Sequence, residues 1–187
     1  MEVLPVLSLE RRKALVVGGA GGGIGSAITY SLAQAGAHVS VITNDTSHAD
    51  SIHSEAKERG HEIHCHIKDV TDLKAFTTTL DDVIAANGSF HNLVNVVGGA
   101  EVRDWSRAKD YELEMFDRII TRNLRYALVS CQRIASTLIS GSTAGSIVNI
   151  SSIATRAVPL LTGYGAAKAG LEAMSRTMAS EWGPVSY

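Results

Sequence analysis

Short apolar segments of strand length alternate along the chain with longer segments whose apolar residues recur at helical spacing. In the first of the longer segments, Ile24, Ala27, Ile28 and Leu32 follow this helical spacing. The segments that predict strands are Ala14–Val17, Val39–Ile42, Glu62–Ile67, Leu93–Val97 and Ser146–Ile150. The segments that predict helices are Ile24–Gln34, Ser47–Arg59, Thr71 to about Ala86, Asp110–Ile139 and Gly163 to Trp182.

The alternation of strands and helices predicts the fold class. Repeated β-α units form a parallel sheet with helices on both faces, because right-handed crossovers place them there. We therefore expect an α/β fold with a doubly wound parallel sheet, a Rossmann-like three-layer α/β/α arrangement. A chain of 187 residues with 45% hydrophobic residues is expected to form a single domain.

Composition and charge exclude several classes of function. The formal net charge of −2 gives no electrostatic reason to expect nucleic acid or an anionic membrane as a partner. No apolar run approaches the roughly 20 residues that span a bilayer. Cys65 and Cys131 lie far apart in sequence, which favours reduced thiols and a cytoplasmic protein. His64 and His66 fall on one face of a predicted strand with no evident further ligands, so we expect no metal site.

A glycine cluster joins the first predicted strand to the first predicted helix. Six of the eight residues in Gly18–Gly25 are glycine, which would destabilise a helix or strand interior. A glycine loop at a helix start exposes backbone N–H groups and the positive end of the helix dipole, which suits a pyrophosphate. The cluster therefore predicts a dinucleotide site. Such folds have about six strands or more, so we expect residues 1–187 to form one dinucleotide-binding domain, incomplete at its C-terminus and lacking its last strand or strands.

The motifs resemble those of the short-chain dehydrogenase/reductase family. Gly19, Gly23, Ile24 and Gly25 match the family's TGxxxGIG loop, with Gly18 where threonine is usual. Tyr164–Lys168 matches the YxxxK motif, and Asn149–Ser152 resembles the strand end that carries the catalytic serine. Further matches are Asp69-Val70 after the third strand, Asn95–Gly98 for the NNAG segment with Val96 and Val97 as departures, and Asn123 for the fourth catalytic position. The resemblance runs from Leu9 to Pro184.

This resemblance implies an oxidoreductase that transfers a hydride between NAD(P)H and a carbonyl/alcohol substrate. Tyr164 would act as the acid/base and Lys168 as its activator, because residues four apart share a helix face and a nearby cation favours a phenolate. Ser152 would orient the substrate oxygen, as its place after the fifth strand suggests, although counting back from Tyr164 favours Ser151. Asn123 would hold a water in a proton relay from Lys168.

The expected cofactor contacts follow the same motifs. They are Gly19, Gly23, Ile24, Gly25, Thr43, Asn44, Asp69, Val70, Asn95, Gly98, Tyr164 and Lys168. A carboxylate after the second strand would favour NAD over NADP. Thr43 and Asn44 occupy that place, which favours NADP slightly, although no basic residue replaces the acid and Asp45 is near.

The resemblance also bears on partners. It implies a homodimer or homotetramer built on the Asp110–Ile139 helix and the final helix, with a small-molecule carbonyl/alcohol substrate. The alternative is a non-catalytic NAD(P)-binding module, or an inactive fragment of such an enzyme, as the departures at Gly18, Val96 and Val97 would allow.

Overall fold

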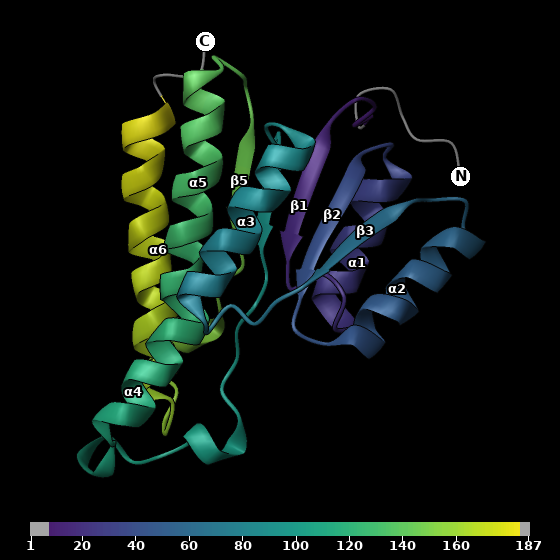
Figure 1. Cartoon of the computed structure of the whole chain (residues 1–187). Coiled ribbons are helices and arrows are strands. Elements are labelled where there is room, and N and C mark those ends of the chain that lie inside the picture. Colours follow the sequence, from purple (N-terminus) through teal and green to yellow (C-terminus); the bar gives the residue numbers. More distant parts are fainter. Residues whose placement is uncertain (1–7, 184–187) are drawn as a thin grey trace.

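The computed structural model describes residues 8–183, which contain one parallel sheet with the strand order β3-β2-β1-β4-β5 (Figure 1). The strands are β1 (Lys13–Val17), β2 (His38–Thr43), β3 (Ile63–Ile67), β4 (Asn92–Asn95) and β5 (Ser146–Asn149). The register pairs Leu15 with Ser40 on one side of β1 and with Leu93 on the other. The order reverses direction between β1 and β4, which makes this pair the switch point of a doubly wound sheet.

The described residues form six α-helices: α1 (Gly23–Gln34), α2 (Thr46–Glu58), α3 (Leu73–Asn87), α4 (Leu113–Ile120), α5 (Tyr126–Ser140) and α6 (Thr162–Trp182). Asp45 is the N-cap of α2 and Asp72 is the N-cap of α3, and in each case the carboxylate accepts a hydrogen bond from an N–H in the first turn. The helix from Thr71 to about Ala86 was therefore predicted within two residues at its start.

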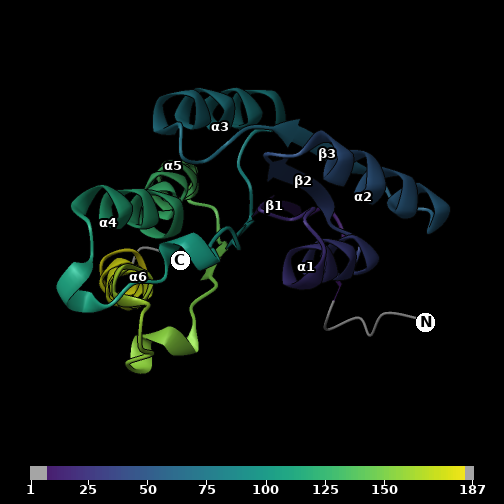
Figure 2. The same ribbon diagram turned by 90° about the horizontal axis from the view of Figure 1, so that it is seen from below.

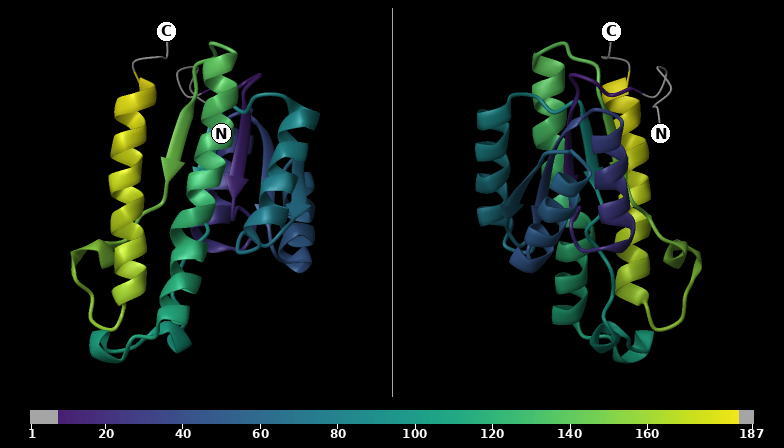
Figure 3. Two further views of the ribbon diagram at one scale, coloured as in Figure 1. Left: turned by 60° about the vertical axis from the view of Figure 1, so that its left-hand side comes forward. Right: turned by 90° about the vertical axis from the view of Figure 1, so that its right-hand side faces the viewer.

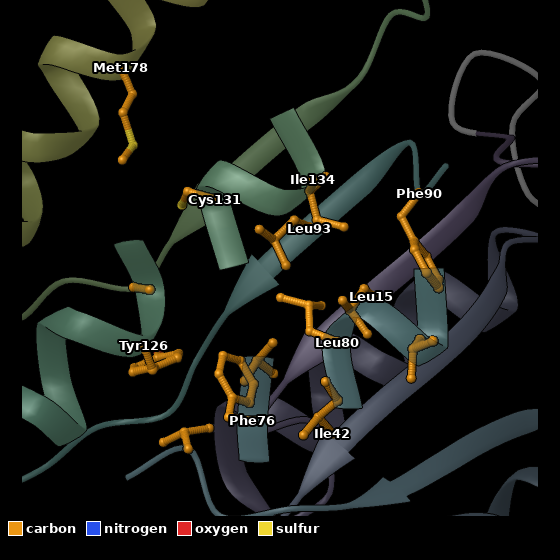
Figure 4. Close-up of a cluster of buried hydrophobic side chains, with 14 of the residues drawn as sticks. Leu15, Ile42, Phe76, Leu80, Phe90, Leu93, Tyr126, Cys131, Ile134 and Met178 are labelled. Atoms are coloured by element: carbon orange, nitrogen blue, oxygen red, sulfur yellow. The ribbon is translucent and has the colours of Figure 1, made fainter. Parts of the chain in front are cut away.

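The helices cover both faces of the sheet, so the predicted three-layer α/β/α fold is confirmed. Helices α1 and α2 pack on one face, where Val16, Val39 and Val41 are fully buried. Helices α3, α5 and α6 contribute to the core on the other face (Figure 2). That second core contains the larger side chains, including Phe76, which meets Tyr126 edge to face (Figure 4).

Two predicted elements differ from the structure. The fourth strand ends at Asn95, opposite Val17, because the partner strand β1 also ends there and turns at Gly18, which has a φ of +91°. The carbonyl of Val17 accepts the N–H groups of both Val96 and Val97. The long helix predicted over Asp110–Ile139 begins at Leu113 instead and is widened by a π-helical turn, Thr121–Arg125, between α4 and α5. Tyr111 is extended rather than helical.

Helices α4 and α5 both pack against α6, with α5 and α6 running side by side (Figure 3). Within residues 8–183, no helix has both the length and the apolar character needed to cross a membrane.

Candidate functional site

A cleft of about 680 Å³ opens at the carboxyl ends of β1 and β4, where ligands bind in open α/β sheets. Residues from the glycine loop, the end of β2, the β3–α3 turn, the segment after β4, and helices α2 and α4 line it. They are Gly18, Gly21, Gly22, Ile24, Gly25, Ile42, Thr43, Asn44, His48, Lys68, Asp69, Val70, Thr71, Val96, Val97, Gly98, Glu101, Arg103, Arg118 and Arg122.

Seven of the predicted cofactor contacts line this cleft: Ile24, Gly25, Thr43, Asn44, Asp69, Val70 and Gly98. Gly19, Gly23, Asn95, Tyr164 and Lys168 are not among its lining residues. Asp69 is fixed within the β3–α3 turn, because its Oδ1 accepts hydrogen bonds of 2.8 Å from both the N–H and the hydroxyl of Thr71.

Packing explains the glycines at the start of α1. A β-carbon on Gly25 would collide with the carbonyl oxygen of Gly18, so the helix can approach the loop this closely only without a side chain. A β-carbon on Gly19 would lie 2.5 Å from Oγ1 of Thr29, which is fully buried and donates a 3.0 Å hydrogen bond to the Gly19 carbonyl. Helix α1 therefore fixes the glycine loop through the bond from Thr29 to Gly19.

The departure at Gly18 has a structural reason. Gly18 has a φ of +91°, which side chains disfavour, and a β-carbon there would lie 2.7 Å from Cγ2 and 2.8 Å from the backbone nitrogen of Val97. The side chain of Val97, which is larger than the alanine of the NNAG segment, thus packs against Gly18, which has no side chain. The loop remains a well-packed connection between β1 and α1 despite both departures.

Asn95 lies beneath the site and is 1% exposed. Its amide nitrogen donates a 2.8 Å hydrogen bond to Asn149, and its amide oxygen accepts one of 2.8 Å from Ser130. The side chain therefore joins β4 to β5 and α5.

Tyr164 and Lys168 stand one turn apart on α6. Lys168 is only 2% exposed, and its Nζ lies 5.9 Å from the centre of the half-buried Tyr164 ring and donates a 2.8 Å hydrogen bond to the Ile150 carbonyl. Burial lowers the pKa of Lys168 to about 8. The ammonium group is therefore protonated at neutral pH beside the phenol.

The two candidate serines have different hydrogen bonds. The Ser151 hydroxyl donates a 2.6 Å bond to the carboxylate of Glu172 on α6. The Ser152 oxygen accepts the N–H of Ala154 at 3.1 Å, which leaves its proton available to a substrate oxygen. The two hydroxyl groups therefore differ in their bonds: that of Ser151 is held by α6, and that of Ser152 accepts a backbone N–H.

Asn123 occupies the middle of the π-helical turn, a feature that is frequent at functional sites. It is fully buried and makes three hydrogen bonds, from the Gly99 N–H at 2.7 Å, to the Gly99 carbonyl at 3.1 Å and to the Ile119 carbonyl at 3.0 Å. A β-carbon on Gly98 would lie 2.7 Å from its Oδ1 and 2.9 Å from Nζ of Lys168. Asn123 and Lys168 therefore approach the same point of the cleft wall.

An ion network that sequence reasoning missed fixes another part of the wall. The side chain of Asp104 is fully buried, and its carboxylate accepts hydrogen bonds from Arg118 at 3.0 Å and Arg122 at 2.7 Å. Arg122 also binds Glu101 at 2.6 Å. Burial raises the pKa of Asp104, but the Glu101 N–H and the two guanidinium groups outweigh it and hold that pKa below its ordinary value. The spacing of Arg118 and Arg122 on one helix face was the only sequence signal.

Together these residues place an acid/base candidate, a buried cation and a hydroxyl donor at the carboxyl edge of the sheet, beside a glycine loop suited to an anion. Known proteins resemble the chain in sequence and in fold. The sequence matches the profile of the short chain dehydrogenases over residues 13–186. A short chain dehydrogenase/reductase of Colletotrichum higginsianum is 33% identical over 179 residues, which cover 94% of this chain and 65% of the relative. The D-erythrulose reductase of Gallus gallus is 33% identical over 181 residues, covering 96% and 69%.

Solved structures give the same result. The NAD⁺-bound xylitol dehydrogenase aligns with a TM-score of 0.85 at 27% identity, covering 94% of this chain and 66% of that one. A gluconate 5-dehydrogenase candidate from Beutenbergia cavernae, with NADP at low occupancy, aligns with a TM-score of 0.86 at 28% identity, covering 96% and 70%. The chain spans about two thirds of the length of these relatives. On the match of its motifs, its fold and its sequence, the chain belongs to the short-chain dehydrogenase/reductase family.

Proposed function

We propose that this protein is an oxidoreductase that interconverts a small carbonyl compound and its alcohol with NAD(P)H. The observation that carries the proposal is the pairing of Tyr164 with the buried Lys168 close to Gly98 on the cleft wall. NAD(P)H, when bound, supplies the hydride for reduction of the carbonyl.

The glycine loop supports the fit of the dinucleotide. Side chains on Gly22 or Gly23 would meet no atom within 4 Å, so this part of the loop is open, whereas Gly25 is closed against Gly18. The pyrophosphate would lie against the loop and the start of α1, the adenine near Asp69 and Val70, and the nicotinamide ribose near Lys168.

The protein groups supply orientation and a proton. Ser152 donates a hydrogen bond to the carbonyl oxygen, and Tyr164 delivers a proton to that oxygen as negative charge develops on it. Lys168 stabilises the resulting phenolate, and the proton returns to Tyr164 from solvent by the route on which we place Asn123. The reverse reaction uses the phenolate as the base.

We propose NADP(H) as the preferred cofactor, because neither Thr43 nor Asn44 brings a carboxylate to the end of β2. We also propose a homodimer or homotetramer. Leu128 and Ile139 on α5 support it, because these apolar side chains are 37% and 42% exposed. Light scattering on the purified chain would give a single protomer mass if this assembly does not form.

The test of the reaction is Tyr164→Phe, with Tyr30→Phe as the matched control, since Tyr30 binds Glu55 away from the cleft. The substrate panel would include erythrulose and xylulose, because relatives are named for reducing them. We expect Tyr164→Phe to bind NADPH normally but to lose reduction by about 100-fold or more. Normal turnover by this variant would refute the catalytic assignment. A wild-type chain that binds NADPH and reduces nothing would support a non-catalytic module.

A further inference from the structure

The cleft wall at the end of β2 contains two basic side chains that come from other elements. His48 lies in the first turn of α2, and Lys68 follows directly after β3. The Lys68 N–H donates a 2.7 Å hydrogen bond to the carbonyl of Thr43, which places Lys68 beside the last residue of β2. A β-carbon on Gly21 would lie 3.7 Å from Nδ1 of His48, so the imidazole lies beside the glycine loop.

The nearest carboxylate in sequence does not face the same space. Asp45 is absent from the residues that line the cleft, and its Oδ1 accepts hydrogen bonds from the Ser47 hydroxyl at 2.6 Å and the His48 N–H at 3.1 Å. These bonds use the carboxylate as the cap of α2. The cleft does contain two other acidic residues. Asp69 is bonded to Thr71, and Glu101 is paired with arginine side chains.

We propose that His48 and Lys68 bind the 2′-phosphate of NADP(H), and so determine the cofactor preference. The proposal rests on the proposed function, which places a dinucleotide in this cleft. A phosphate on the adenosine ribose would lie near the end of β2, where an imidazole N–H and an ammonium group can both donate to it. NADH lacks this phosphate and gains nothing from either side chain.

The sequence pattern did not show this pair. The end of β2 carries Thr43, and Asn44 follows it; neither residue is basic. His48 comes one helical turn later, and Lys68 is brought to the same place only by the parallel pairing of β2 with β3, in which Thr43 lies opposite Ile67.

The experiment is a fluorescence titration of the 187-residue chain with NADPH and, separately, with NADH. The variants are His48→Ala, Lys68→Ala and the double substitution. The matched controls are His53→Ala and Lys57→Ala, which alter exposed residues of α2 that do not line the cleft. We expect the wild-type chain to bind NADPH more tightly than NADH. Each cleft variant should weaken NADPH binding by about tenfold and the double variant by about 100-fold, with NADH binding almost unchanged.

The outcomes separate this inference from the proposed function. If the wild-type chain binds NADH as tightly as NADPH, or if the cleft variants keep the wild-type affinity for NADPH, the inference is wrong and the dinucleotide site remains. Equal losses for the two nucleotides would also overturn it, because the side chains would then serve the shared part of the cofactor. If neither nucleotide binds, the inference and the proposed function fail together.

Discussion

Asn123 allows the most detailed prediction, because all the contacts of its buried amide are defined. The substitution Asn123→Ala removes the hydrogen bonds to the N–H and carbonyl of Gly99 and to the carbonyl of Ile119. The alanine side chain has no polar atom to take over these bonds. The segment Gly98–Gly99, which is held against the π-helical turn, would lose its attachment beside Lys168.

The size of the effect follows from these three bonds. A buried hydrogen bond contributes about 1 kcal/mol net, and leaving its partner unsatisfied costs about 1–3 kcal/mol. Because Gly99 is half-buried and water reaches it in part, we take the lower value for each bond. The free energy of unfolding should therefore fall by about 3 kcal/mol, and the Tm by about 9 °C for a chain of this size.

The assay is urea unfolding followed by circular dichroism, together with NADPH titration of the folded variant. Asn87→Ala is the matched control, because Asn87 donates only one side-chain bond, of 2.9 Å to Val83 at the end of α3. We expect the control to lose less than about 1 kcal/mol. Equal losses for the two variants would refute the role assigned to Asn123. The variant Asn123→Asp adds a second check, since a carboxylate accepts the Gly99 N–H but repels both carbonyls, and wild-type stability in this variant would also refute it.

Three further predictions concern the loop and the ion network. Thr29→Val should lower the free energy of unfolding by about 1–2 kcal/mol and weaken NADPH binding, because the Gly19 carbonyl loses its hydrogen-bond donor. Thr29→Ser keeps the hydroxyl and should preserve stability and binding, and thermal melting and NADPH titration of the two variants compare them. Gly25→Ala should cost about 2 kcal/mol or more, because the new methyl group collides with Gly18, and an unchanged urea midpoint would contradict the packing. The depressed pKa of Asp104 stabilises the fold above the ordinary carboxyl pKa, and this contribution is lost as pH falls through the lower folded-state value. Acid unfolding curves of the wild type and Asp104→Ala should therefore converge as pH falls below about 4, and curves that stay parallel would exclude this linkage.

Local patterns predicted most of the fold, because each strand and helix has its own hydrophobic period. They could not locate the end of β4, since Val96 and Val97 continue an apolar run, and the strand ends only because its partner β1 turns away at Gly18. The start of α4 was missed for a similar reason. Tyr111 and Glu112 are both extended, so the helix begins only at Leu113, and the Tyr111 ring meets Phe116 edge to face.

The candidate site likewise contains residues that local spacing predicts and residues that only the tertiary structure shows. Motif spacing identified Tyr164 and Lys168, whose relation depends only on the geometry of one helix. The buried Asp104 and its arginines were not predicted, because the network depends on how the loop after β4 folds onto α4. Spacing also left Ser151 and Ser152 unresolved, and the bonds from Ser151 to Glu172 and from the Ala154 N–H to Ser152 distinguish them.

The central claim is that the glycine loop binds the phosphates of a dinucleotide, and Gly21→Asp tests it most directly. A β-carbon on Gly21 has no neighbour closer than 3.7 Å and the backbone φ there is not positive, so the variant should fold with the wild-type Tm. The new carboxylate would lie in the cleft lining beside His48, where it would repel the phosphates of a bound dinucleotide. We predict that wild-type chain binds NADPH in a fluorescence titration and that folded Gly21→Asp loses at least about 100-fold in affinity. Binding of NADPH by Gly21→Asp with wild-type affinity would contradict the account.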